Sequence, residues 1–181
     1  GCSRLIEEIN GSRRALVPVV FLGPSLRNGR ADRVAHFSDV WDAPHNWPDS
    51  EVLGFEPTSE ELASINEAVK LAADSDVSVA VLGGCLRTCG ENRTRTSLDL
   101  PPVQEMLLKE LKKTGKPLVV VLVTGRPLSV NWTDRNADAI VQAFYPGAHG
   151  GTAVAQVLSG EYNPGGKITV TYPRTVGQIP F

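Results

Sequence analysis

The sequence has 181 residues, of which 41% are hydrophobic and 21% charged, a composition typical of one soluble globular domain. Its 18 Lys and Arg residues are offset by 20 Asp and Glu residues, and a net charge of -2 lacks the positive field that binds nucleic acid. The apolar runs, such as residues 117–123, are far shorter than the ~20 residues that cross a bilayer. We therefore expect no nucleic-acid partner and no membrane span.

A complete (β/α)8 barrel, which takes about 250 residues, is also excluded by length. Because the first residue is Gly1 rather than Met, we expect a processed or excised segment.

Short β-branched runs alternate along the chain with patterns of helical period. Thr58 and Glu61 have the spacing of a capping box, Pro101 and Pro102 open a further helix, and Gly115 closes it. Strands are predicted at residues 15–22, 77–82, 118–123 and 139–144, with an edge strand at 168–172, and helices at 3–9, 60–73, 101–115 and 152–158.

Continuous apolar strands that alternate with helices predict a mostly parallel sheet covered on both faces. The expected fold class is α/β, a three-layer α/β/α sandwich over residues 1–181 with an antiparallel edge strand. Sites in such sheets form at the carboxyl ends of the strands. The loops in which we expect a site are therefore residues 23–57, 83–100, 124–138 and 145–151.

Three of these loops contain residues with recognisable chemistry. Trp41 and Trp47 lie in the first loop with Phe37, His36 and His45, and could stack on a sugar, form a docking surface or pack the loop onto its own domain. Gly150 and Gly151, beside His149, could bind a phosphate at a helix N-terminus or simply permit a tight turn. No dinucleotide-binding or Walker pattern supports the phosphate hypothesis.

Cysteine usage indicates no disulfide scaffold and no metal centre. Cys85 and Cys89 lie in one loop, where they are free or locally paired, and Cys2 is far from them in the sequence. No second pair of ligands accompanies them, so we expect no bound metal, and the redox compartment stays open.

Glu91 is the candidate catalytic residue of the loop at 83–100, which follows a central predicted strand. Arg93 and Arg95 flank it, and neighbouring guanidinium groups would keep its carboxylate ionised, as in a structural ion pair. Work as a general acid would need a second carboxylate nearby to keep Glu91 protonated. The chain offers no obvious partner of that kind, so both roles stay open at this point.

From Ala73 onward the chain resembles the C-terminal domain of glycoside hydrolase family 3, the β-glucosidase and β-xylosidase group. Long motifs carry the resemblance in family order, among them GENRTRTSLDLP, GKPLVVVLVTGRPL and YPGAHGGTA. Their residues, with those of the other matching stretches, are 90–101, 115–128, 137–140, 145–153, 157–167 and 172–180. Residues 1–58 carry little of the resemblance.

The resemblance implies a retaining β-glycosidase, in which two carboxyl groups about 5 to 5.5 Å apart flank the scissile bond of a β-glucoside or oligosaccharide. The Glu of the family's acid/base stretch falls on Glu91, and the nucleophilic Asp would lie on an N-terminal (β/α)8 barrel that this chain lacks. Arg93, Arg95, Trp41 and Trp47 become candidate substrate-binding residues. The family implies no cofactor and a secreted or periplasmic location, with the cytoplasm left open. The chain alone is expected to be inactive.

Two other hypotheses compete with the enzyme. One is a non-catalytic carbohydrate-binding or interaction module of the same fold, in which Trp41 and Trp47 rather than Glu91 matter. The other is a flavodoxin-like cofactor domain, which the missing phosphate-binding sequence argues against.

Overall fold

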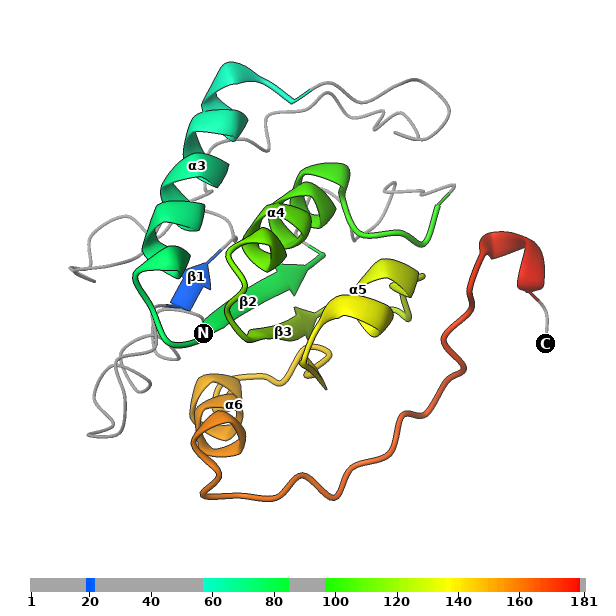
Figure 1. The fold of residues 1–181 in the computed structure, drawn as a ribbon. Coiled ribbons are helices and arrows are strands. Elements are labelled where there is room, and N and C mark those ends of the chain that lie inside the picture. Colours follow the sequence, from blue (N-terminus) through cyan, green and yellow to red (C-terminus); the bar gives the residue numbers. More distant parts are fainter. Residues whose placement is uncertain (1–18, 22–56, 85–96, 180–181) are drawn as a thin grey trace.

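The fold is an α/β sandwich built on a parallel sheet (Figure 1). A computed structural model describes residues 19–21, 57–84 and 97–179. Its sheet contains β1 (Val19–Phe21), β2 (Ser78–Gly83), β3 (Leu118–Val123) and β4 (Ala139–Gln142). The strands are arranged in the order β1-β2-β3-β4, and every neighbouring pair is parallel. The carboxyl ends of β2, β3 and β4 consequently meet at one edge of the sheet.

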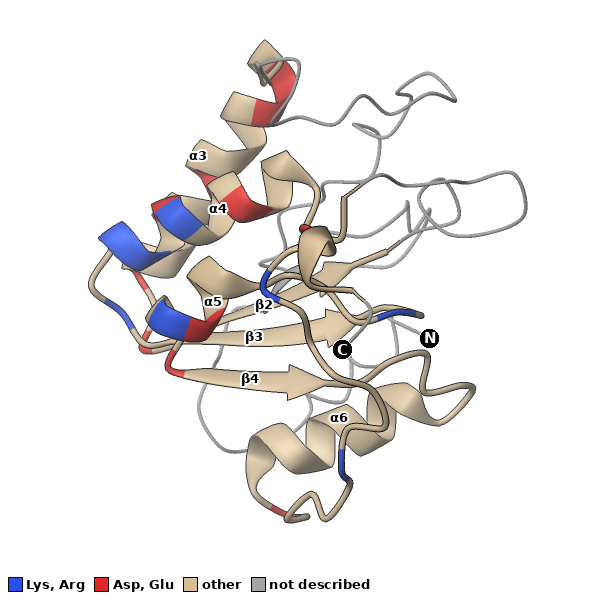
Figure 2. Ribbon diagram, turned by 90° about the vertical axis from the view of Figure 1, so that its right-hand side faces the viewer, with Lys and Arg blue, Asp and Glu red and all other residues tan. Residues whose placement is uncertain are grey.

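Helices cover both faces of the sheet, as the apolar strands predict. Figure 2 shows α3 (Ser59–Ala73), α4 (Pro102–Lys113) and α5 (Asn131–Asn136) on one side of the strands and α6 (Gly150–Ser159) on the other. Acidic and basic residues gather along α3, α4 and α5 in the same view, whereas the α6 ribbon carries almost none. The three-layer arrangement is confirmed.

The central strands alternate between two separate cores. Ala80 and Leu82 of β2 pack toward α3 and α4, where Leu107 is fully buried. Val79 and Val81 of the same strand pack toward α6, where they meet Val154. Because β2 is covered on both faces, all six of its residues are buried, and this explains its unbroken run of small and β-branched side chains.

The predicted helix boundaries follow the expected capping chemistry. The Thr58 side chain accepts a hydrogen bond from the backbone N–H of Glu61 at 3.2 Å, and the Glu61 carboxylate accepts one from the backbone N–H of Thr58 at 2.6 Å. This reciprocal pair is the capping box that starts α3. At α4, Pro101 precedes the helix and Pro102 is its first residue, a position where no N–H is needed.

Strand bounds differ from the prediction at β2, which is Ser78–Gly83 rather than 77–82, and at β4. Val19–Phe21 forms a strand within the predicted range 15–22, whose other residues, like the predicted helix 3–9, lie outside the described residues. β4 ends at Gln142 rather than at 144, since Phe144 has φ +52° and turns the chain out of the sheet. The short helix α5 was not predicted.

The predicted edge strand at residues 168–172 is wrong for the described structure. This segment has no strand assignment, and Ile168 and Val170 are 59% and 44% exposed. The chain instead runs from α6 around to α5, where Asn131 Nδ2 donates a hydrogen bond to the carbonyl of Arg174 at 2.7 Å (Figure 1). Alternation of apolar residues with Thr is typical of a half-buried strand. In the structure residues 168–171 are all exposed, Tyr172 is half-buried and Pro173 is buried, so burial does not alternate along the segment.

No helix among the described residues is long and apolar enough to cross a membrane.

Candidate active site

The predicted site residues follow β1 and β2 in the sequence. Glu91, Arg93 and Arg95 belong to residues 85–96, and Trp41 and Trp47 belong to residues 22–56. Both segments lie outside the described residues, as do the three cysteines, so none of these side chains has a described position. The structure does describe the residues at which the Glu91 loop leaves the sheet and returns to it.

The departure point is Gly83, which a buried glutamine of α4 holds by both of its backbone groups. The backbone N–H of Gly83 donates to Gln104 Oε1 at 3.0 Å, and Gln104 Nε2 donates to the Gly83 carbonyl at 3.1 Å. Gln104 is 2% exposed, so both hydrogen bonds lie away from solvent. The next residue is also fixed, because the N–H of Gly84 donates to the carbonyl of Val123 at 3.1 Å.

Only glycine fits at position 83. Its φ is +140°, a conformation that residues with a side chain rarely adopt, and an added Cβ would lie 2.0 Å from the carbonyl oxygen of Val123. Gly83, the last residue of β2, thus has a definite structural role. It lets β2 and β3 stay in contact while the chain turns toward the loop.

The return point is fixed by the segment that follows β3. The N–H of Ser129 donates to the carbonyl of Leu98 at 2.9 Å. The residues on either side of Leu98 form a compact turn. Ser97 Oγ donates a hydrogen bond to the Asp99 carboxylate at 2.6 Å and accepts one from the Asp99 N–H at 3.0 Å. Leu100 is then buried and leads into α4. The described residues on both sides of 85–96 are therefore held by hydrogen bonds.

The segments that follow β3 and β4 contact each other. Thr124 Oγ1 closes a turn by donating to the carbonyl of Arg126 at 3.0 Å. The absence of a side chain at Gly125 makes room for the Tyr145 ring, whose Cε2 would be 2.6 Å from an added Cβ. Tyr145 is 54% exposed and follows Phe144, whose positive φ is an outlier for a bulky residue. The geometry therefore places an exposed aromatic ring at the carboxyl edge.

The glycines at the start of α6 serve packing. An added Cβ at Gly150 would lie 2.3 Å from Cγ of Pro146, so the turn from β4 into α6 requires glycine there. His149 precedes the helix without forming a side-chain cap and is exposed. These contacts account for Gly150 by a tight turn and lend no support to phosphate binding.

Two titratable groups among the described residues have a shifted pKa. At the amino end of β4, the Lys112 ammonium and then the Leu118 N–H, both at 2.8 Å, hold the pKa of Asp138 below its ordinary value. Burial raises the pKa of the Tyr172 hydroxyl. No group of His, Cys, Asp and Glu in the described ranges could hold a metal ion.

Sequence reasoning missed Gln104 and Tyr145. Gln104 lies on the helical face that also carries Leu107, Leu108 and Leu111, and a polar residue on an otherwise apolar face was the available signal. Tyr145 fell within one of the expected site loops, but an aromatic residue in a loop does not by itself indicate where its ring lies.

Comparison with known proteins decides what kind of domain this is. Residues 7–181 match the glycosyl hydrolase family 3 C-terminal domain. The chain belongs to that family. The resemblance seen in the motifs is therefore confirmed over nearly the whole chain, including most of the first 58 residues, in which the motifs were sparse.

Relatives of this family 3 domain include enzymes named for two sugars. A periplasmic β-glucosidase of Salmonella typhimurium is 46% identical over 72% of this chain, and a β-xylosidase of Formosa agariphila is 48% identical over 63%. A solved β-glucosidase of Listeria innocua, in complex with isofagomine, superposes with a TM-score of 0.67 and 25% identity over 95% of this chain. The chain spans only 17% and 16% of the two relatives and 25% of the solved chain.

Proposed function

We propose that this chain is the C-terminal domain of a retaining β-glycosidase of the β-glucosidase type, which removes terminal non-reducing β-D-glycosyl residues. The observation that carries the proposal is the family 3 match over residues 7–181, together with a glutamate in the loop at the carboxyl end of a central strand. The relatives' names support glucosides and xylosides as the substrate class. The proposed nucleophile is a carboxylate of a (β/α)8 barrel domain, supplied by the same polypeptide or by a partner.

Glu91 would act as the general acid and base of a double displacement. In the first step its carboxyl group gives a proton to the glycosidic oxygen while the barrel carboxylate attacks the anomeric carbon, and the alcohol departs. In the second step the Glu91 carboxylate takes a proton from water, whose oxygen replaces the enzyme ester at the anomeric carbon. The glutamate ends the cycle protonated, as it began. A negative nucleophile nearby would keep it protonated in the resting enzyme.

The anchoring of the loop supports this role. Glu91 lies between Gly84 and Ser97 in the sequence, and the chain is held at both sides of that interval by the Gln104 and Ser129 hydrogen bonds. A loop with fixed ends on a rigid sheet can present a residue to a second domain at low entropic cost. Arg93, Arg95, Trp41 and Trp47 are proposed to contact the sugar or to hold the loop around it.

A leaving-group comparison tests the assignment of Glu91. Glu91→Gln is made in the protein that contains both this domain and a barrel, and hydrolysis is measured with two aryl β-glucosides. We expect a loss of about 10²- to 10⁴-fold for a poor leaving group such as methylphenol. The loss should be much smaller for dinitrophenol, which departs without a proton. Glu161→Gln, at an exposed glutamate after α6, is the matched control and should leave both rates unchanged.

Equal losses for the two substrates would contradict an acid role for Glu91. Sugar binding that survives Glu91→Gln but is lost on Trp41→Ala or Trp47→Ala, with no hydrolysis at all, would favour the non-catalytic module. A secreted or periplasmic location is proposed because the Salmonella relative is a periplasmic enzyme. Fractionation of the source cells tests it.

A further inference from the structure

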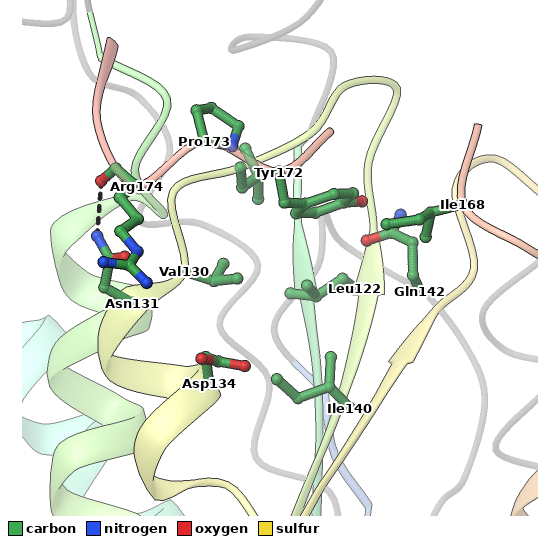
Figure 3. Close-up of a pocket in the computed structure, with 11 residues that line it drawn as sticks. Leu122, Val130, Asn131, Asp134, Ile140, Gln142, Ile168, Tyr172, Pro173 and Arg174 are labelled. Atoms are coloured by element: carbon green, nitrogen blue, oxygen red, sulfur yellow. Dashed lines mark hydrogen bonds between the residues drawn. The ribbon is translucent and has the colours of Figure 1, made fainter. Parts of the chain in front are cut away.

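A pocket of about 310 Å³ lies between α5, the sheet and the segment that follows α6. The residues around it come from β3, the connection from β3 to α5, α5, β4 and the segment 168–174 (Figure 3), and none of them is a residue proposed to bind the sugar. Most of its wall is aliphatic. The apolar residues that line it are Leu122, Leu128, Val130, Ile140, Ile168 and Pro173.

Two polar side chains at this pocket have no hydrogen-bond partner. Both amide atoms of Gln142 and the hydroxyl of Tyr172 are buried, and none of them is bonded within the described structure. In Figure 3 the Tyr172 ring and the Gln142 amide lie on the same side of the pocket, beside Ile168. Folded proteins pair nearly all such buried groups, because leaving them unpaired is costly. Their presence here points to a missing partner.

One residue of the wall beside the polar groups is exposed. Ile168 lies next to the Gln142 amide (Figure 3) and is 59% exposed, in a segment that forms no strand. Turning that one side chain outward would open the amide to the pocket. The opposite wall is rigid, since Leu122 and Leu128 are almost completely buried in the core.

We propose that this pocket binds a small neutral alcohol with an apolar body, its hydroxyl paired with Gln142 and Tyr172. An amide and a phenol each offer a donor and an acceptor, which is what a hydroxyl group requires. Burial raises the pKa of the Tyr172 hydroxyl, so this group stays neutral. Among the described lining residues the charged ones are Asp134 and Arg174, which are exposed and of opposite sign, so the pocket favours no net charge.

The wall chemistry favours an organic ligand over water. Six of the eleven residues that line the pocket are apolar, and the apolar body of an organic ligand would remove their surface from water. Water would satisfy Gln142 and Tyr172 but would gain nothing from six apolar neighbours. The proposal goes beyond the glycosidase function and does not depend on it, because binding is measured directly on the 181-residue chain.

Benzyl alcohol and toluene form the matched pair of probes, since they differ only in the hydroxyl. Each is titrated into the ¹⁵N-labelled chain while amide resonances are followed. We expect benzyl alcohol to shift resonances of α5, β4 and residues 168–174 with a dissociation constant on the order of 1 mM. Toluene should bind several-fold more weakly, because it leaves the buried polar groups unpaired.

Two conservative variants separate ligand binding from a structural role. Tyr172→Phe and Gln142→Met should each weaken benzyl alcohol binding by about 2- to 10-fold. In the absence of ligand they should leave Tm unchanged or raise it by about 1 to 3 °C, because each removes an unpaired buried polar group. Tyr162→Phe and Gln156→Met change the same residue types at exposed positions and should alter neither quantity. Ile168→Ala should strengthen binding by opening the wall.

The proposal is overturned if toluene and benzyl alcohol bind equally, or if neither shifts the pocket resonances. It is also overturned if Tyr172→Phe and Gln142→Met lower Tm without affecting binding, which would indicate hydrogen bonds that hold the fold. A crystal structure with ordered waters only at both side chains, at saturating benzyl alcohol, would have the same consequence.

Discussion

Gln104 hydrogen-bonds to both backbone groups of Gly83, 21 residues earlier in the chain. In a parallel sheet the N–H and C=O of one residue point to the same side, so the glutamine amide does at Gly83 what a neighbouring strand would do. It also ties α4 to the carboxyl end of β2. The direction in which the chain leaves the sheet toward Glu91 is thus set by a side chain from the helix that follows the loop.

Gln104→Leu should lower the free energy of unfolding by about 2 to 4 kcal/mol, because it leaves the N–H and the C=O of Gly83 buried without partners. Urea unfolding of the 181-residue chain measures the loss. Gln156→Leu, at an exposed position of α6, controls for the change of residue type and should cost little. Equal effects of the two substitutions would show that the Gly83 bonds add nothing to stability.

Gly83→Ala should destabilise the fold more than Gly115→Ala. Both glycines have a positive φ, which is strained for a residue with a side chain. An added Cβ at Gly115 nevertheless has open space around it. At Gly83 it would lie 2.0 Å from the carbonyl oxygen of Val123, so β2 and β3 must separate locally at a further cost of about 1 to 3 kcal/mol. Thermal unfolding of the two variants gives the comparison. A Gly83→Ala protein as stable as Gly115→Ala would contradict the described backbone.

The fold was largely predictable because its central elements obey strong local rules. β3 (Leu118–Val123) has its predicted bounds, and the capping box at Thr58 and Glu61 starts α3 where expected. Each depends on signals within a few residues: an unbroken apolar run, or a pair of side chains at fixed spacing. The short α5 lacks both, since it has no side-chain cap and only six residues.

Tertiary contacts explain what the sequence did not reveal. The alternating residues 168–172 have the pattern of a strand, yet whether a strand forms depends on an available sheet edge, which lies far away in the sequence. The Gln104–Gly83 bonds likewise join distant residues. The position of its loop after a central strand singled out Glu91, whereas its acid/base role came from the resemblance and stays a proposal.

Asp138→Asn should reduce stability in a pH-dependent manner. The carboxylate accepts hydrogen bonds from Lys112 Nζ and the Leu118 N–H, and these lower its pKa from the ordinary value of 3.8. A lowered pKa in the folded state means that the stabilisation is fully present above that value and is lost as the pH falls below it. The difference between wild type and Asp138→Asn should therefore be constant from neutral pH to about pH 5 and shrink below pH 4.

Urea unfolding at a series of pH values tests this expectation for Asp138. Glu67→Gln, at an exposed residue of α3, serves as the control and should show a small difference at every pH. A wild-type advantage that grows as the pH falls would mean that the carboxylate is not stabilised in its charged form.

The 181-residue chain by itself should hydrolyse no aryl β-glucoside. In the proposed mechanism the covalent intermediate forms on a barrel carboxylate, and without that group Glu91 can donate a proton but no nucleophile attacks the anomeric carbon. Release of nitrophenol by the purified chain, with and without an added family 3 barrel domain, measures the requirement. Activity that appears only on mixing would support a site divided between two domains. With a poor leaving group, this activity should disappear again when the chain carries Glu91→Gln. Hydrolysis by the chain alone, retained after repeated purification, would require a second carboxylate within these residues and would overturn the proposed division.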